Sequence, residues 1–105
     1  AVDQCWYGIT QIKRGVATDL AVTNCGARGV SGPKFRGERV TVTGNGDTGI
    51  LVDRLVLRDS TVTGNGVDTD GIDILSSRRP KLVGTTCGRS QDEVTGLPFG
   101  VCTLD

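Results

Sequence analysis

The residues best suited to chemistry are four aspartates, because carboxylates serve as acids, bases and ligands of hard cations. Asp68, Asp70 and Asp73 lie close together in the chain, and Asp47 precedes them. Hydrolysis of a glycosidic bond requires at least two carboxyl groups that face one sugar, and Ca²⁺ requires several oxygen ligands. Asp47, Asp68 and Asp70 form a candidate calcium site, whereas Asp70 and Asp73 are candidate catalytic residues only through a local resemblance that is described below. For Asp47, Asp68 and Asp70 we favour the alternative that they are solvated turn residues, and we expect no cofactor and no metal.

The four cysteines, Cys5, Cys25, Cys87 and Cys102, are the other reactive side chains. None belongs to a Cys-x-x-Cys pair and the chain contains no histidine, so the usual ligand pattern of a zinc site is missing. Two interpretations remain: two disulfides, or four reduced thiols buried as small apolar groups. We favour disulfides, which predict a secreted or cell-surface protein.

The elements that position these residues are repeats of one phrase. Residues 41–46 (Thr-Val-Thr-Gly-Asn-Gly) recur at 61–66, and degraded copies stand at 21–26 and 83–88. Each copy is followed by a glycine and an apolar residue. Those pairs are Gly29-Val30, Gly49-Ile50, Gly71-Ile72 and Gly100-Val101, with Gly8-Ile9 before the first copy. A period near 20 residues predicts a solenoid, whose units bury their apolar faces by stacking.

Each unit is predicted to be made of strands. Val40 and Val42 alternate with Thr41 and Thr43, and this period of two with β-branched residues is typical of strands. No stretch keeps a helical spacing long enough for a helix of useful length. We therefore expect one domain, residues 1–105, with about five turns of 20–22 residues. The expected core is Ile9, Val22, Val30, Val42, Ile50, Val52, Val62, Ile72 and Ile74.

This pattern resembles the pectin-lyase-like superfamily, in particular its short-repeat, secreted bacterial members. The resemblance covers essentially the whole chain and implies an all-β fold, the right-handed parallel β-helix. It implies no single function, because this fold carries lyases, hydrolases, epimerases, tailspikes and purely structural proteins.

The repeat register predicts how the cysteines pair. Cys5 falls within one position of Cys25, one turn away. Adjacent strands lie about 4.8 Å apart, and a disulfide joins Cα atoms roughly 4.4–6.8 Å apart. Cys25 and Cys87 share a column but lie three turns apart, which is too far. We therefore expect Cys5–Cys25, and Cys87–Cys102 closing an irregular last turn that carries an insertion at residues 89–96.

A local resemblance concerns residues 68–74, Asp-Thr-Asp-Gly-Ile-Asp-Ile. They are similar to the Asn-Thr-Asp-Gly-Ile-Asp segment of polygalacturonases, which implies that Asp70 stands at the position of a catalytic carboxylate. That family places an Asp-Asp pair on the next turn, followed by Gly-His-Gly and Arg-Ile-Lys. Here the next turn, residues 81–87, contains no acid and the chain has no histidine. We therefore expect no enzyme, with a polysaccharide lyase or glycoside hydrolase as the alternative.

Two outward columns of polar residues are predicted, one of charges and one of threonines, together with a column of asparagines at the turns. The charges before each first strand alternate in sign, although each exposed pair stabilises by only about 0–1 kcal/mol; they are Asp19, Arg39, Asp59 and Lys81. Asn45 and Asn65 stack at the turns, where their amides can bond along the column. The threonine column is Thr23, Thr43, Thr63 and Thr85. Its paired Thr-x-Thr units also resemble ice-binding β-helices, a further alternative.

Charge and chain ends give the expected partners. The chain carries 12 basic and 12 acidic residues, which argues against a nucleic-acid or anionic-membrane partner, and no apolar run is long enough for membrane insertion. The last turn finishes with the strand-like Val101 and Thr103 and offers no capping helix. Unpaired strand edges invite stacking, and a head-to-tail interface that does not close gives a filament.

The expected function is therefore that of a secreted structural solenoid that associates end to end with copies of itself. The predicted interface residues are Trp6, Tyr7, Ile9, Leu97, Phe99 and Val101. Two alternatives concern the ends: disulfides that themselves cap them, or a chain that is a piece of a longer β-helix. The alternative function is a module that binds or degrades polysaccharide.

Overall fold

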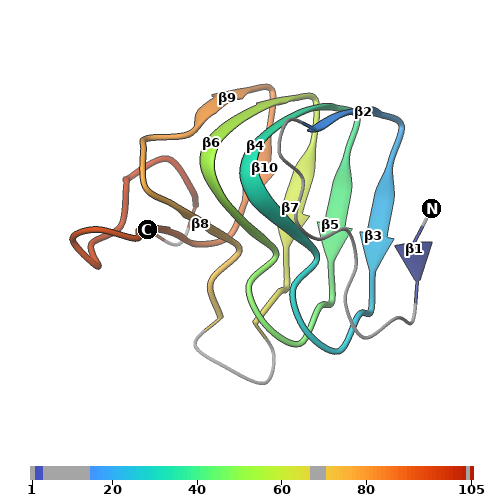
Figure 1. The fold of residues 1–105 in the computed structure, drawn as a ribbon, viewed down its shortest axis with the longest axis horizontal. Coiled ribbons are helices and arrows are strands. Elements are labelled where there is room, and N and C mark those ends of the chain that lie inside the picture. The colour runs from blue at the N-terminus through green and yellow to red at the C-terminus, as the bar shows by residue number, and fades with distance from the viewer. Residues whose placement is uncertain (1, 4–14, 67–70, 104) are drawn as a thin grey trace.

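The computed structural model describes residues 2–3, 15–66, 71–103 and 105. In this part of the chain eleven strands and no helix form a parallel β-solenoid of about four turns (Figure 1). The prediction of an all-β parallel solenoid is confirmed, and the prediction of five turns is slightly too high. The first and last turns lie at opposite ends of the stack (Figure 1).

Two parallel sheets make up the turns. The first sheet has the order β1 (Val2–Asp3), β3 (Ala21–Thr23), β5 (Thr41–Thr43), β7 (Thr61–Thr63) and β10 (Thr86–Cys87). The second has the order β11 (Ser90–Asp92), β8 (Ile74–Ser76), β6 (Ile50–Arg58), β4 (Val30–Glu38) and β2 (Gly15–Thr18). A further strand, β9 (Lys81–Val83), pairs with the second half of β6.

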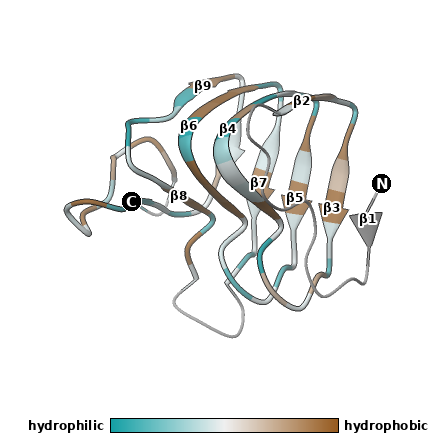
Figure 2. Cartoon of the chain, in the orientation of Figure 1, coloured by the Kyte–Doolittle hydropathy of each residue, from teal (hydrophilic) through white to brown (hydrophobic). Residues whose placement is uncertain are grey.

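The core lies between the two sheets and is built from the alternating apolar residues. Val22, Val42 and Val62 pair directly in β3, β5 and β7, and all three are fully buried. The hydrophobic residues appear as brown bands along the strands (Figure 2). The predicted core residues that are confirmed are Val22, Val30, Val42, Ile50, Val52, Val62 and Ile74. Ile9 lies outside the described residues. Phe35, Val40, Leu55 and Leu57 belong to the core as well.

The long strands β4 and β6 bend because the side of the strand that faces the core changes along them. Ile50 and Val52 are buried, two exposed residues follow, and then Leu55 and Leu57 are buried. A strict period of two would place Arg54 inside. β4 repeats this pattern, and its Pro33 at the bend is missing from the strand pairing because proline has no N–H to donate.

Left-handed residues make the corner between the second sheet and the first. Asp19, Arg39 and Asp59 have φ angles of 56°, 53° and 48°, and Gly84 has 56°. The backbone N–H groups of Asp19, Arg39 and Asp59 donate to carbonyl groups of the next turn, which belong to Glu38, Arg58 and Val83 respectively. Gly84 therefore stands fourth in this column. The prediction that Lys81 continues the charge column is wrong, since Lys81 pairs with Val56.

The later turns are longer than the repeat predicts, which shifts the register. Ile50 pairs with Ile74, 24 positions on, so Gly49 stands over Asp73 and not over Gly71. The prediction that Ile72 is core is wrong, since this side chain is only half-buried. Val101 and Thr103 form no strand, so the predicted continuation of the glycine column at Gly100-Val101 is also wrong; Ser90 follows Ile74 in that column.

The last turn of the first sheet is displaced in the same way. Thr86 pairs with Thr61 and Cys87 with Val62. Thr85 therefore does not continue the column of Thr23, Thr43 and Thr63, which was the prediction. Likewise Cys87 does not share a column with Cys25. Extra residues between the second and last copies of the phrase shift both Thr85 and Cys87 by three positions from the predicted register.

Candidate functional site

A buried ladder of amides runs along the stack just after the first sheet. The Cys25 N–H donates to Asn45 Oδ1 at 2.9 Å, and the Asn45 N–H donates to Asn65 Oδ1 at 3.2 Å. Asn45 Nδ2 also donates to Asn65 Oδ1, at 2.7 Å. The side chains of Asn45 and Asn65 are 0% and 4% exposed. The two asparagines thus stack at the turns, and their buried side chains bind the backbone of the neighbouring turn.

Asp73 continues this ladder. Its Oδ1 accepts hydrogen bonds from the Asn65 N–H and from Asn65 Nδ2, both at 2.9 Å, and its Oδ2 accepts from the Arg89 N–H at 2.9 Å. The Asp73 residue is only 3% exposed. This candidate catalytic carboxylate therefore takes the place of the next asparagine, and both of its oxygens bind groups of the protein.

Two glycines make room for the ladder. A Cβ at Gly29 would lie 2.9 Å from Asn45 Nδ2, and a Cβ at Gly49 would lie 2.6 Å from Asn65 Nδ2. Both contacts are closer than Cβ atoms tolerate. Asp73 follows Gly29 and Gly49 in the same column, and there the side chain itself supplies the ladder oxygen.

Of the other candidate aspartates, the structure describes only Asp47. It is half-buried, accepts a hydrogen bond from the Thr48 N–H at 2.8 Å, and lies 3.9 Å from the Arg28 guanidinium. Asp68 and Asp70 lie outside the described residues. Within the described ranges no three His, Cys, Asp or Glu side chains are grouped closely enough to hold a metal ion.

Threonines line the outer face of the first sheet in two columns. Thr23, Thr43 and Thr63 pair as predicted. The second column is Thr41, Thr61 and Thr86. Thr85 has a different role: its Oγ1 accepts a hydrogen bond from the Ser60 N–H at 3.4 Å and donates to the Val83 carbonyl at 3.1 Å.

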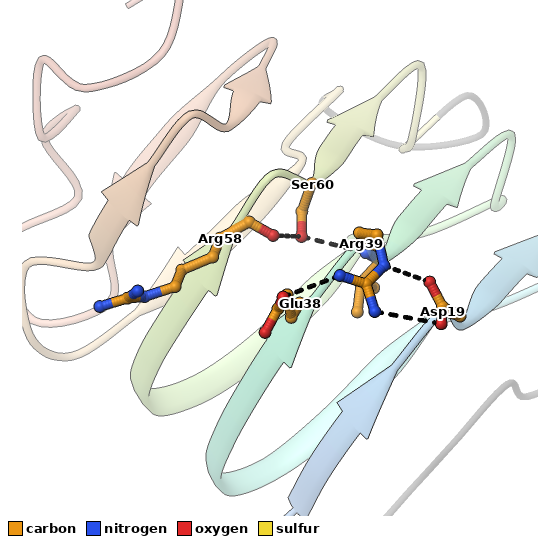
Figure 3. A network of polar contacts seen from close by, with 6 residues as sticks. Asp19, Glu38, Arg39, Arg58 and Ser60 are labelled. Carbon is orange, nitrogen blue, oxygen red and sulfur yellow. Dashed lines mark hydrogen bonds and ion pairs between the residues drawn. The ribbon is translucent and has the colours of Figure 1, made fainter.

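An exposed ion pair holds the corner between the first complete turns. Arg39 binds Asp19 through Nε and Nη2, and binds Glu38 through Nη1 at 2.8 Å (Figure 3). The hydrogen bond from Arg39 lowers the pKa of Asp19 below its usual value. Beside it, Ser60 Oγ accepts from the Val40 N–H and donates to the Arg58 carbonyl. The predicted attraction between Asp19 and Arg39 is thus present.

The last turn is closed by residues 93–103 and Asp105, which we call the closing segment. A disulfide joins Cys87 to Cys102, with Cα atoms 4.9 Å apart, as predicted. The Thr103 N–H and Thr103 Oγ1 both donate to the Cys87 carbonyl at 3.0 Å. The described cysteines include no free thiol. Cys5 lies outside the described residues, so its bond to Cys25 stays a prediction.

Asp105 fastens the closing segment to β11. Its carboxylate accepts hydrogen bonds from the N–H and Oγ of Ser90, and from the N–H groups of Val101 and Cys102. Burial raises the pKa of Asp105, but the bonds from Ser90, Cys102 and Val101 outweigh it, so the pKa is lower than usual. This role could not be predicted from the sequence, because Asp105 and Ser90 belong to no repeat.

The predicted interface residues are placed only in part. Leu97 is 65% exposed, while Phe99 and Val101 are half-buried against the last turn. The Phe99 N–H donates to Ser90 Oγ at 3.2 Å. Trp6, Tyr7 and Ile9 lie outside the described residues, so the interface stays a prediction.

Comparison with models of known protein families, with curated proteins and with solved structures finds no match. Among the described residues no helix is long and apolar enough to cross a membrane. The site is therefore interpreted from its own geometry.

Proposed function

We propose that this protein is a secreted, non-enzymatic structural β-solenoid that acts through its surfaces and associates with copies of itself. The observation that carries the proposal is the state of Asp73. This carboxylate of the polygalacturonase-like segment is buried and binds Asn65 and the Arg89 N–H through its two oxygens. A general acid or nucleophile must instead face its substrate.

The ends of the stack support association at the first turn. Among the strands that the structure describes, β1 and β2 are the last ones of the two sheets at that end. At the other end the closing segment binds the Cys87 carbonyl and the Ser90 N–H. A head-to-tail filament would require the closing segment to leave β10 and β11, so the geometry favours contacts between first turns. The disulfide supports an oxidising compartment.

We further propose that the solenoid is right-handed and related to the pectin-lyase-like superfamily. Its two parallel sheets and turns of 20 or more residues support this relationship. The proposal predicts that an experimental structure will show right-handed turns; left-handed turns would refute it.

The enzyme question is tested by incubating the protein with polygalacturonate, with and without Ca²⁺. We expect neither reducing ends nor unsaturated products above the level of a boiled sample. Cleavage that is lost in Asp70→Asn would overturn the proposal and establish the polysaccharide-degrading alternative. Asp53→Asn is the matched control, because Asp53 is exposed on the second sheet.

Self-association is tested by sedimentation velocity over a concentration series. The Asp19 N–H donates to Glu38 in β4, and alternate N–H groups of a parallel strand point to opposite sides. The Thr18 N–H is thus directed away from β4, and Thr18→Pro removes this donor from the edge. We expect the wild type to associate and Thr18→Pro to stay monomeric, while Thr95→Pro in the closing segment associates like the wild type. A wild type that stays monomeric at all concentrations would refute this part.

A further inference from the structure

The outer face of the second sheet gathers positive charge, although the chain as a whole is neutral. Five cations of β4, β6 and β9 are exposed on it, and we call them the basic face. They are Lys34, Arg36, Arg54, Arg58 and Lys81. The hydropathy colouring shows hydrophilic stretches on these three strands (Figure 2).

The strand pairing fixes where these cations stand. Lys34 pairs with Arg54, and Val56 pairs with Arg36 on one side and Lys81 on the other. Paired residues lie about 4.8 Å apart across the strands, and residues two apart on one strand lie about 6.6 Å apart. The five charges thus share an area of roughly 10 by 13 Å on the same spacings.

The basic face is poorly neutralised. The ion pairs among the described residues join Arg28 to Asp47, and Arg39 to Asp19 and Glu38, and involve none of the five cations. Glu38, which pairs with Arg58 across the strands, is bound by Arg39. The Arg58 side chain extends away from Glu38 and Arg39 (Figure 3). The basic face is therefore available to an external anion.

Two hollows with apolar surface lie on this face. A hollow of about 360 Å³ is lined by Val16, Ala17, Thr18, Arg36, Gly37, Glu38, Val56, Arg58 and Lys81. A second, of about 270 Å³, shares Val16, Arg36 and Val56 with it. Val16 is 74% exposed, and Val83 on β9 is 52% exposed. Unpaired cations and exposed valines therefore stand side by side.

We propose that the basic face docks on the surface of an anionic phospholipid bilayer, with lipid phosphates in the hollows against Arg36, Arg58 and Lys81. Arginine binds phosphate oxygens through two parallel N–H groups. Val16 and Val83 then enter the boundary between headgroups and acyl chains, where apolar side chains are favoured. The net charge of the chain does not reveal this surface, because it averages the basic face with acids elsewhere.

The mixture of side chains favours a bilayer over a hydrophilic polyanion. A polysaccharide presents many hydroxyl groups that donate hydrogen bonds, and Thr18 and Glu38 supply the only side-chain acceptors that line the larger hollow. Single-stranded nucleic acid is usually held by aromatic side chains on which bases stack, and the larger hollow is lined by none. Exposed valines would gain less from either hydrophilic polymer than from the apolar boundary of a bilayer, which buries them.

The test is flotation of the oxidised full chain with vesicles of phosphatidylglycerol and phosphatidylcholine in equal parts, and with vesicles of phosphatidylcholine alone. Binding is expected only to the anionic vesicles, and it should disappear at about 1 M salt, where the Debye length falls to about 3 Å. Each basic residue near an anionic bilayer contributes about fivefold to binding. Arg58→Gln should therefore weaken binding about fivefold, and Arg36→Gln with Arg58→Gln about 25-fold.

The matched control is Arg89→Gln, which removes the same charge from the exposed Arg89 beside the closing segment. It should bind vesicles like the wild type. The proposal would be overturned if the protein bound both vesicle types equally, or if Arg89→Gln lost as much binding as Arg58→Gln. It would also be overturned if inorganic phosphate alone, at moderate concentration, abolished vesicle binding. Retention on polygalacturonate or single-stranded DNA without binding to anionic vesicles would assign the face to those polymers instead.

Discussion

Asp73 shows how one residue can carry a catalytic signature and perform a structural task. In the chain it stands in an Asp-Gly-Ile-Asp segment, and in the fold it ends a ladder begun by Asn45 and Asn65. An asparagine there would present two donors and one acceptor, whereas the ladder requires two acceptors. The acid is explained by the hydrogen bonds that it accepts.

Asp73→Asn should therefore destabilise the protein. The substituted amide would turn a donor toward either Asn65 or the Arg89 N–H, and an unsatisfied buried donor costs about 1–3 kcal/mol. Urea unfolding followed by circular dichroism measures the change, and Asp53→Asn should alter the free energy of unfolding by less than about 0.5 kcal/mol. Equal stability of the two variants would contradict the ladder.

At this scale the sequence predicted the stacking of Asn45 and Asn65 but not the burial of their side chains. An asparagine after a strand is compatible with an outward turn position, and the inward orientation depends on the space left by Gly29 and Gly49. The role of Asp73 depends on the pairing of Ile50 with Ile74, whereas the repeat alone predicted a pairing with Ile72.

At the scale of elements, the burial of Val42 in β5 tests the strand register, because this residue faces the core while Val16 in β2 faces solvent. Val42 is 0% exposed between paired Val22 and Val62, whereas Val16 in β2 is 74% exposed. Val42→Asp should unfold the domain, because an unpaired charge buried in the stack costs several kcal/mol. Val16→Asp should leave a folded, protease-resistant protein. Limited proteolysis of both variants would reveal a wrong register if they behave alike.

The strands themselves could be predicted because alternation and β-branched residues act locally. The pairing of the later turns could not, since a parallel strand can slide when an insertion lengthens the preceding loop. Ile72 and Ile74 both fit the alternation, and only the pairing of Ile74 with the buried Ile50 decides that Ile74 faces the core. Thr85 and Thr86 present the same ambiguity.

At the scale of the whole molecule, the closing segment makes the two ends of the stack different. It could not be predicted from the repeat, because residues 93–105 contain no copy of the phrase and bind through Asp105, Ser90 and the Cys87–Cys102 disulfide. The disulfide itself was predicted, since the irregular last turn left Cys102 as the partner within reach.

The attachment of this segment should depend on pH. The pKa of Asp105 is lowered in the folded protein, so its carboxylate stabilises the closed segment above the unfolded pKa of about 3.9. This stabilisation is lost as the pH falls below that value and through the folded pKa. Hydrogen exchange at the Ser90, Val101 and Cys102 amides should rise relative to the Val42 and Val62 amides as the pH falls through this range, after correction for intrinsic rates.

Asp105→Asn provides the control for this pH effect. The variant should show raised relative exchange at Ser90 already at neutral pH, with no further rise in acid, while the disulfide keeps the segment tethered. Unchanged protection of the Ser90 amide in the variant would show that the disulfide alone holds the segment.

The corner residues Asp19, Arg39 and Asp59 have a consequence for the length of the molecule. Because the three corners share one backbone conformation and a spacing of 20, a duplicate of residues 39–58 inserted after Arg58 would receive and offer the same edges as its template. A turn of this chain can therefore stack on a copy of itself. Tandem duplication within a gene would then lengthen the stack by about 4.8 Å per copy and would move the closing segment outward unchanged. Small-angle scattering from chains with one and two inserted copies would measure this stepwise increase in the length of the molecule.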